Sequence, residues 1–379
     1  MSIYLDYNAS TPIDDRVLEV MVNAYRNYYG NADSRTHDYG NNARTQLEKA
    51  REQVASLLSI EKNEVIFTSG ATESDNLSIL GLAEYGVKNN RRHIITTAIE
   101  HKAVLEPMKQ LIDRGFEVEF ISPDYNGRVN EDEVLSKVRT DTLLVSVMHA
   151  NNETGIIQPV KEIGYELNKT DTYFHIDAAQ SFGKLVEELQ NVNYDLLSCT
   201  AHKMYGPQGI GALILKTKNY KRPPIKPIMY GGGHERGLRP GTLPVALIVG
   251  FGKACEIAGN EYKEAWENYR MNKDIIMRMI SDAGLKCDIN GEQEYGMPNT
   301  LNISFTGIDS EALMLATKQF CGVSNGSACT SHDYSLSHVL TAMGLAANRI
   351  ESAIRLSFGK YEIEYEEIKN FIYFIKKNQ

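Results

Sequence analysis

The sequence predicts an α/β protein with a mostly parallel seven-stranded sheet between helices, followed by a smaller α+β domain. Over the first two thirds of the chain, short β-rich runs alternate with helical segments, which is typical of a parallel sheet covered on both faces. Beyond that region, a Gly-rich segment at 230–244 leads into one long helical stretch, and few strand-like runs follow. At 379 residues, the chain is long enough for two or three domains.

Two amphipathic helices are expected ahead of the sheet, at 14–29 and 41–58, from the spacing of their apolar residues. Runs rich in β-branched and aromatic residues predict the seven strands. These strands are expected at 64–70, 91–100, 118–123, 143–152, 172–180, 195–202 and 210–217. Apolar residues at helical spacing between several of the strands predict further helices. These helices are expected at 71–86, 102–115 and 160–170.

The smaller domain is expected to follow a long helix at 245–280, which would connect it to the first domain. A strand at 299–307 and a helix at 310–320 come next, and then a loop at about 321–336 that contains Cys329. The predicted large domain covers 14–255, and the predicted small domain covers 1–13 and 256–379.

Composition limits the classes of function. The formal net charge is −9, which argues against direct, sequence-independent nucleic-acid binding, because such binding needs a cationic surface. The N-terminus lacks the basic and apolar regions of a signal peptide, and no apolar run approaches a membrane span. We therefore expect a cytoplasmic protein without membrane contact. Its five cysteines are widely spaced and contain no CxxC pair, which indicates free thiols.

The residues that follow each predicted strand are the first candidates for a site, because ligands of open parallel sheets bind beyond the strand ends. After "VIFT" of the first strand, Ser69, Gly70, Ala71 and Thr72 form a turn into a helix. Backbone N–H groups at such a turn suit a phosphate. The same residues would equally suit a simple helix cap.

Two further strand ends carry an acid and a base. Asp177 follows "FHI" and could be an N-cap, whereas Lys203 follows "LLSCTAH" and precedes a Gly-rich turn. A lysine beside a buried strand is unusual, and in a desolvated site its amine can form a Schiff base. The order phosphate turn, aspartate, lysine indicates pyridoxal 5'-phosphate, with Asp177 on the pyridine nitrogen and Lys203 on the aldehyde.

The sequence resembles the cysteine desulfurases of the NifS/IscS type, which are class V aminotransferase-like enzymes of fold-type I. The resemblance extends across nearly the whole chain. It rests on "YLDYNASTP", "FTSGATESDNL", "EHKAVL", "HANNETG", "HIDAAQSFGK", "AHKMYGPQGIGAL", "GGGHERGLRPGT" and "SNGSACTS". In the last motif, Asn325 stands where a serine is usual, a small polar change that we expect to be tolerated.

The resemblance implies a role for each candidate residue. Lys203 would carry the cofactor, and His101 would stack on its ring. Asn152 and Gln180 would lie near the ring, and Arg355 would bind the substrate carboxylate with its planar fork. The phosphate would be held by a larger set, with Thr242 contributed by the neighbouring subunit of a homodimer. That set is Ala71, Thr72, Thr200, His202 and Thr242.

Structural roles stay open for three of these residues. His101 could be a core histidine, Arg355 could form a surface ion pair, and Asn152 could stabilise a turn.

Cys329 is the expected nucleophile. Small residues such as Gly326 around it are typical of a mobile loop, and His332 or His101 could help to form the reactive thiolate. The expected reaction transfers sulfur from L-cysteine to Cys329 as a persulfide and releases L-alanine. Cys321 is expected to be a packed thiol. A zinc site made of Cys321, Cys329, His332 and His338 matches no usual spacing, so we expect no metal.

The alternatives are a selenocysteine lyase or another β-lyase on the same scaffold, an aminotransferase, or a scaffold protein whose active site has decayed. The sulfur acceptor is not evident from the sequence. Iron–sulfur cluster assembly, tRNA thiolation and sulfur modification of DNA through partner proteins all fit. The chain stops soon after its last helix, which weakens the expectation of one particular iron–sulfur scaffold partner.

Overall fold

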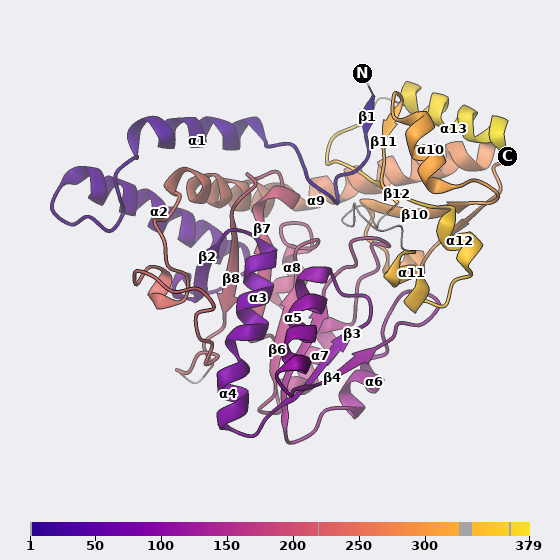
Figure 1. The fold of residues 1–379 in the computed structure, drawn as a ribbon. Coiled ribbons are helices and arrows are strands. Elements are labelled where there is room, and N and C mark those ends of the chain that lie inside the picture. The colour runs from indigo at the N-terminus through magenta and orange to yellow at the C-terminus, as the bar shows by residue number, and fades with distance from the viewer. Residues whose placement is uncertain (1, 219, 326–335, 364) are drawn as a thin grey trace.

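The computed structural model describes residues 2–218, 220–325, 336–363 and 365–379 (Figure 1). Two helices precede the large sheet, α1 (Asp15–Asn27) and α2 (Asp38–Leu57). The Asp14 side chain accepts a hydrogen bond from the backbone N–H of Arg16 and so caps α1. The side chain of His37 caps α2 in the same way, which is why α2 begins three residues before its predicted start at 41.

The large sheet has seven strands in the spatial order β2-β8-β7-β6-β5-β3-β4. Their bounds are β2 (Val65–Thr68), β3 (His93–Thr97), β4 (Glu117–Ile121), β5 (Thr142–Met148), β6 (Tyr173–Asp177), β7 (Leu196–Thr200) and β8 (Gly211–Leu215). Only β8 pairs antiparallel with its neighbours, β2 and β7, and the other pairings are parallel. The predicted fold class and all seven predicted strands are therefore confirmed.

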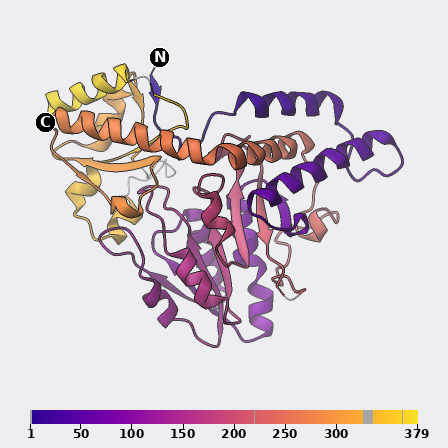
Figure 2. The ribbon, with the colours of Figure 1, turned by 180° about the vertical axis from the view of Figure 1, so that it is seen from behind.

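Helices cover both faces of this sheet, as Figures 1 and 2 show. Within β2, Val65 and Phe67 belong to the core on one face and Ile66 to the core on the other, as the strand period of two requires. The covering helices are α3 (Ala71–Gly81), α4 (Ala83–Lys88), α5 (Lys102–Asp113), α6 (Glu131–Ser136), α7 (Val160–Leu167) and α8 (Val186–Gln190). The helix predicted at 71–86 is thus divided in two, with Leu82 between α3 and α4.

The long helix α9 (Val245–Asp282) runs from the large sheet to a second, three-stranded sheet (Figure 2). The second sheet has the order β12-β10-β9. Its elements and their helices are β9 (Cys287–Ile289), β10 (Thr300–Phe305), α10 (Ser310–Thr317), α11 (His338–Ala342), α12 (Ala347–Glu351), β12 (Ala353–Ser357) and α13 (Glu366–Asn378). Since α9 continues unbroken across residue 255, the domain boundary placed there stays a prediction.

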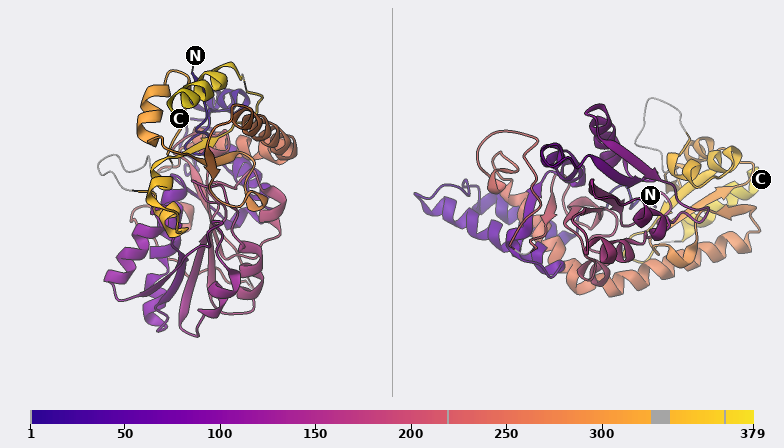
Figure 3. Two further views of the ribbon diagram at one scale, coloured as in Figure 1. Left: turned by 90° about the vertical axis from the view of Figure 1, so that its right-hand side faces the viewer. Right: turned by 90° about the horizontal axis from the view of Figure 1, so that it is seen from below.

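The N-terminus lies with the C-terminal third of the chain (Figures 1 and 3). Strand β1 (Ile3–Tyr4) pairs in parallel with β11 (Cys321–Gly322), and Asp6 forms a further bridge to Ser357 of β12. Four short 3-10 helices complete the described structure: η1 (Lys62–Glu64), η2 (Ala201–Lys203), η3 (Glu235–Gly237) and η4 (Gln293–Tyr295). Within the described ranges, we find no helix with the length and apolar character needed to span a bilayer.

Candidate active site

A cavity of about 610 Å³ lies at the carboxyl ends of the parallel strands. It contains every predicted site residue except Thr242 and Cys329. These lining residues come from the ends of β2, β5, β6 and β7, from the start of α5, and from β12: Ala71, Thr72, His101, Asn152, Asp177, Gln180, Thr200, His202, Lys203 and Arg355. Predicted residues as far apart in the sequence as Ala71 and Arg355 therefore share one site.

The turn between β2 and α3 has the backbone features of an anion-binding site. Gly70 is the N-cap of α3, and no side chain caps this helix end. Its φ of 155° is one that residues with a side chain rarely adopt. A Cβ built on Gly70 would lie 3.7 Å from Oγ1 of Thr200, which shows how closely β7 approaches the turn. The first N–H groups of α3 and its dipole therefore favour a negatively charged ligand.

Asp177 lies at the end of β6, where Oδ1 accepts a hydrogen bond from the backbone N–H of Ala179 at 2.8 Å. Burial, and then the nearby carboxyl of Asp75, raise the pKa of Asp177 to about 6. Burial also raises the pKa of Asp75 to about 7, and its Oδ1 lies 3.5 Å from Nε2 of His175. A positively charged ring nitrogen is the kind of partner that would stabilise the ionised form of Asp177.

His101 is the N-cap of α5, and its Nδ1 accepts a hydrogen bond from the backbone N–H of Ala103 at 3.1 Å. Burial lowers the pKa of His101, and the positive charge of Lys203 lowers it further. The ring is therefore neutral at pH 7, and because Nδ1 is an acceptor, the proton is on Nε2. His202 is also neutral at pH 7, because burial and the positive charge of Lys203 lower its pKa to about 4.

Gln180 and Arg355 each have a buried polar atom without a hydrogen-bond partner among the described residues, Oε1 and Nε respectively. The amide nitrogen of Gln180 donates to the carbonyl oxygen of Asn8 at 3.0 Å, and Nη1 of Arg355 donates to the carbonyl oxygen of Asn152 at 2.8 Å. Buried polar atoms are seldom left unsatisfied, so these atoms are expected to meet a bound molecule.

Thr242 is exposed and lies outside the cavity. It lines a separate hollow of about 300 Å³ with tyrosines of α1 and the residues that follow it, among them Tyr25 and Tyr29. Within one chain, Thr242 is therefore not brought together with the other predicted residues. Cys329 lies outside the described residues, as do His332 and Gly326.

Four cysteines are described, and none of them lines the cavity. Burial raises the pKa of the thiol in all four, to about 12 in Cys321. The prediction that Cys321 is a packed thiol is confirmed, because it is buried in the core around the smaller sheet.

Several lining residues were not predicted. Asp6, Asn8, Glu73 and Asp75 all lie within motifs that support the family resemblance, which is the signal that could have identified them. Asn8 is buried and donates from Nδ2 to Oγ1 of Thr300 at 2.9 Å. The N-terminal segment therefore supplies one wall of the cavity.

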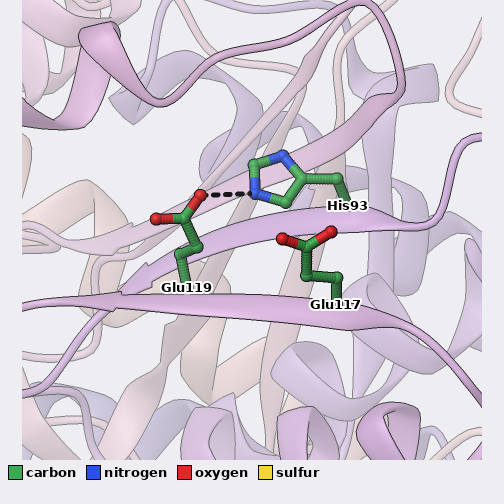
Figure 4. Close-up of side chains that lie close together, drawn as sticks. All are labelled: His93, Glu117 and Glu119. Atoms are coloured by element: carbon green, nitrogen blue, oxygen red, sulfur yellow. Dashed lines mark hydrogen bonds and ion pairs between the residues drawn. The ribbon is translucent and has the colours of Figure 1, made fainter.

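One cluster with metal-ligating side chains lies away from the cavity (Figure 4). His93 and Glu117 are the first residues of β3 and β4, and Nε2 of His93 lies 3.1 Å from Oε1 of Glu119. Arg139 pairs with Glu117 at 2.7 Å and Lys137 with Glu119 at 3.1 Å. Because both carboxylates already have cationic partners, we assign no function to this cluster.

The fold and the cavity define the class of the protein. The model of the aminotransferase class-V family matches residues 3–371, and the chain belongs to this family. A curated relative named cysteine desulfurase IscS, from Anaeromyxobacter dehalogenans, is 44% identical over 364 residues, which cover 96% of this chain and 89% of the relative.

Two solved structures support the same assignment. A NifS-like protein is 40% identical, with a TM-score of 0.90 and coverage of 100% of this chain and 99% of that protein. A protein named SspA, solved in complex with cysteine, is 34% identical, with a TM-score of 0.81 and coverage of 96% and 100%. These comparisons confirm the resemblance to the cysteine desulfurases that the sequence motifs indicate.

Proposed function

We propose that this chain is a pyridoxal-phosphate-dependent cysteine desulfurase, which converts L-cysteine into L-alanine and transfers the sulfur to an acceptor protein through Cys329. The observation that carries this proposal is the convergence of Lys203, Asp177, His101 and Arg355 on one cavity at the strand ends. The cysteine desulfurase relatives and the cysteine complex of SspA support the reaction and the substrate.

The cavity fits pyridoxal 5'-phosphate by the chemistry of its donors. The uncapped start of α3, with Ala71 and Thr72, would hold the phosphate together with Thr200 and His202. The buried carboxylate of Asp177 would hold the ring nitrogen, and Lys203 would hold the aldehyde. When bound, the cofactor supplies an electron sink that makes the substrate Cα–H acidic and weakens the Cβ–S bond.

Arg355 and Asn152 bind the substrate carboxylate. Arg355 is 5% exposed, and its Nε, which has no hydrogen-bond partner in the described part of the chain, offers one arm of a fork toward a carboxylate. A buried guanidinium attracts a carboxylate more strongly than an exposed one, because less water screens the charges.

Lys203 is the general base of the reaction, and His101 is a neutral hydrogen-bond donor in the same site. Lys203, once it no longer holds the cofactor, removes the Cα proton as a general base. His101 is neutral near pH 7 with its proton on Nε2, so this nitrogen can donate a hydrogen bond to a bound molecule. The low pKa of His101 keeps the ring in this neutral form.

Cys329 is the nucleophile. Its thiolate attacks the substrate sulfur, the new S–S bond forms, and the electron pair of the broken Cβ–S bond stays with the carbon fragment, which gains protons and leaves as alanine. The other four thiols are poor candidates because burial raises the pKa of each. Ser324 lines the cavity, and the five residue-to-residue steps from Ser324 to Cys329 can span at most roughly 17 Å, so the chain is long enough for Cys329 to reach a substrate in the cavity.

The active form is a homodimer, in which Thr242 reaches the phosphate of the neighbouring subunit. The outer face of α1 supports this arrangement, because it exposes large apolar residues at helical spacing beside the hollow that contains Thr242. On α1 these residues are Leu18, Val22 and Tyr25, and the exposed Tyr29 follows just beyond the helix.

The protein acts in the cytoplasm and delivers persulfide sulfur to a protein acceptor, with iron–sulfur cluster assembly ranked first. The test is to add L-cysteine and a thiol reductant to the purified holoenzyme and to measure alanine and sulfide. Equal amounts of the two support the proposal. Turnover of selenocysteine but not of cysteine would replace it with the selenocysteine lyase alternative.

A further inference from the structure

The guanidinium group of Arg355 already has a carboxylate partner inside the cavity. Its Nη2 donates to Oδ1 of Asp6 at 2.5 Å, and both residues line the cavity. Arg355 is the residue proposed to bind the substrate carboxylate. Asp6 therefore already pairs with the guanidinium group that the carboxylate of an incoming amino acid needs.

The backbone fixes the position of Asp6. The N–H of Leu5 donates to the carbonyl oxygen of Gly322, and the N–H of Ser357 donates to the carbonyl oxygen of Leu5, each at 2.8 Å. Asp6 then forms a parallel bridge to Ser357, two residues beyond Arg355 on β12. The contact between Asp6 and Arg355 follows from this strand register and not from a chance side-chain rotamer.

The ion pair leaves Arg355 partly unsatisfied. Nη1 donates to the carbonyl oxygen of Asn152 at 2.8 Å, whereas the buried Nε has no partner among the described residues. The side chain of Asp6 is 21% exposed and that of Arg355 is 6% exposed. Asp6 is thus the more solvent-exposed partner of the pair, and water can solvate its carboxylate when another anion approaches Arg355.

We propose that Asp6 is a resident carboxylate that competes with the substrate carboxylate for Arg355 and so sets the affinity of the site for amino acids. This inference rests on the proposed function. L-cysteine and L-alanine carry the same carboxylate, so competition by Asp6 weakens both complexes and speeds release of the product. Asp6 acts through Arg355 and is a positioning residue.

The substitution Asp6→Asn separates charge from geometry. Asparagine keeps a side-chain oxygen that can accept from Nη2, so Arg355 stays in place, but the negative charge is lost. The holoenzyme variant should then bind carboxylates more tightly, since an uncompensated guanidinium in a buried site attracts them more strongly. Asp15→Asn is the matched control, because it removes the same charge from an exposed position on α1.

Two probes isolate the carboxylate. 3-Mercaptopropionate has the thiol and carboxylate of cysteine but no amine, and cysteamine has the thiol and amine but no carboxylate. Calorimetric titration of the holoenzyme should give a Kd for 3-mercaptopropionate that is about tenfold lower in D6N than in the wild type or D15N. The Kd for cysteamine should not change. In turnover of L-cysteine, KM and kcat should both fall in D6N.

A Kd for 3-mercaptopropionate that is unchanged or higher in a folded D6N holoenzyme would overturn the inference, and so would an equal change for cysteamine. Circular dichroism and the cofactor absorbance establish that the variant is folded and loaded, and Asp6→Glu, which keeps the charge, should remain near the wild-type Kd. Failure of the proposed function looks different, because the wild-type holoenzyme would then not release sulfide from cysteine.

Discussion

Arg51 and Glu235 form a buried ion pair in which Nη1 and Nη2 of the arginine meet the two carboxylate oxygens at 2.8 and 2.6 Å. Glu235 also accepts the backbone N–H of Phe67 at 2.7 Å. The pair therefore attaches the loop that contains Thr242 to α2 and to β2, just before the turn that begins α3. Glu235 has a φ of 44°, an uncommon conformation for a residue other than glycine, and this attachment holds it there.

Replacing Arg51 by Met should lower the free energy of unfolding by about 3–5 kcal/mol, because it leaves the Glu235 carboxylate buried without its cation. Urea denaturation of the protein measures this loss. Lys62→Met, which breaks the exposed pair between Lys62 and Glu52, is the control and should change stability little. A loss no larger in R51M than in K62M would show that the buried pair does not stabilise the loop.

Cofactor uptake by the apoprotein should weaken as the pH falls through about 6. The pKa of Asp177 is raised to about 6 by burial and by Asp75, so below that pH the carboxyl is protonated and no longer attracts a positively charged ring nitrogen. The measurement is the Kd for pyridoxal phosphate from pH 5 to 8. The Asp177→Asn variant is the control. It lacks this carboxyl, so the pH dependence of its Kd comes from other groups, including the cofactor phosphate itself.

Asp75→Asn should shift the loss of pyridoxal phosphate affinity at acidic pH to a lower pH. Removing the neighbouring carboxyl removes a repulsion that disfavours the ionised form of Asp177, so the pKa of Asp177 falls. If the affinity in the variant falls at the same pH as in the wild type, or at a higher pH, this account of the raised pKa of Asp177 is contradicted.

Lys203→Ala should abolish the near-visible absorbance of the lysine-linked cofactor and reduce sulfide release by several orders of magnitude, because we propose that this residue both holds the aldehyde and removes the Cα proton. Absorbance and turnover are measured on the same preparation. Lys161→Ala, an exposed lysine of α7, should behave like the wild type. A K203A protein that keeps both the band and the activity would refute the assignment.

Mixing two impaired variants tests whether Thr242 acts across the dimer. Thr242→Asp should weaken binding of the cofactor phosphate by charge repulsion, and Lys203→Ala is inactive. A mixed dimer of the two chains has one site with both defects and one site with neither, so activity should return to about half of the wild type per dimer. No recovery in mixed dimers isolated by two different tags would place Thr242 at the site of its own chain.

The sequence was sufficient for the fold class, because the strand period and helix period each reflect local burial. Lys203 and Asp177 could be located for the same reason, since parallel strands bring their carboxyl ends to one edge. The strand order was not accessible, because the pairing of β8 with β2 joins segments that are distant in sequence. The division at Leu82 also escaped prediction, since 71–86 keeps helical apolar spacing throughout.

Asp6 and Glu235 lie within the family motifs, but their structural roles could not be predicted from the sequence. Each meets an arginine far away in the chain, at separations of 349 and 184 residues, and a charge pattern in the sequence does not indicate such partners. Thr242 is different, because its predicted site is on another subunit and one chain cannot bring it to the cavity.

The most direct test of the central claim compares the wild type with Cys329→Ala, both loaded with cofactor, given L-cysteine and a thiol reductant. The wild type should release alanine and sulfide in equal amounts. C329A should keep the cofactor absorbance, show a spectral change when cysteine is added, and release no sulfide above the uncatalysed rate. Full sulfide release by C329A would contradict the claim that sulfur leaves the substrate through a persulfide on Cys329.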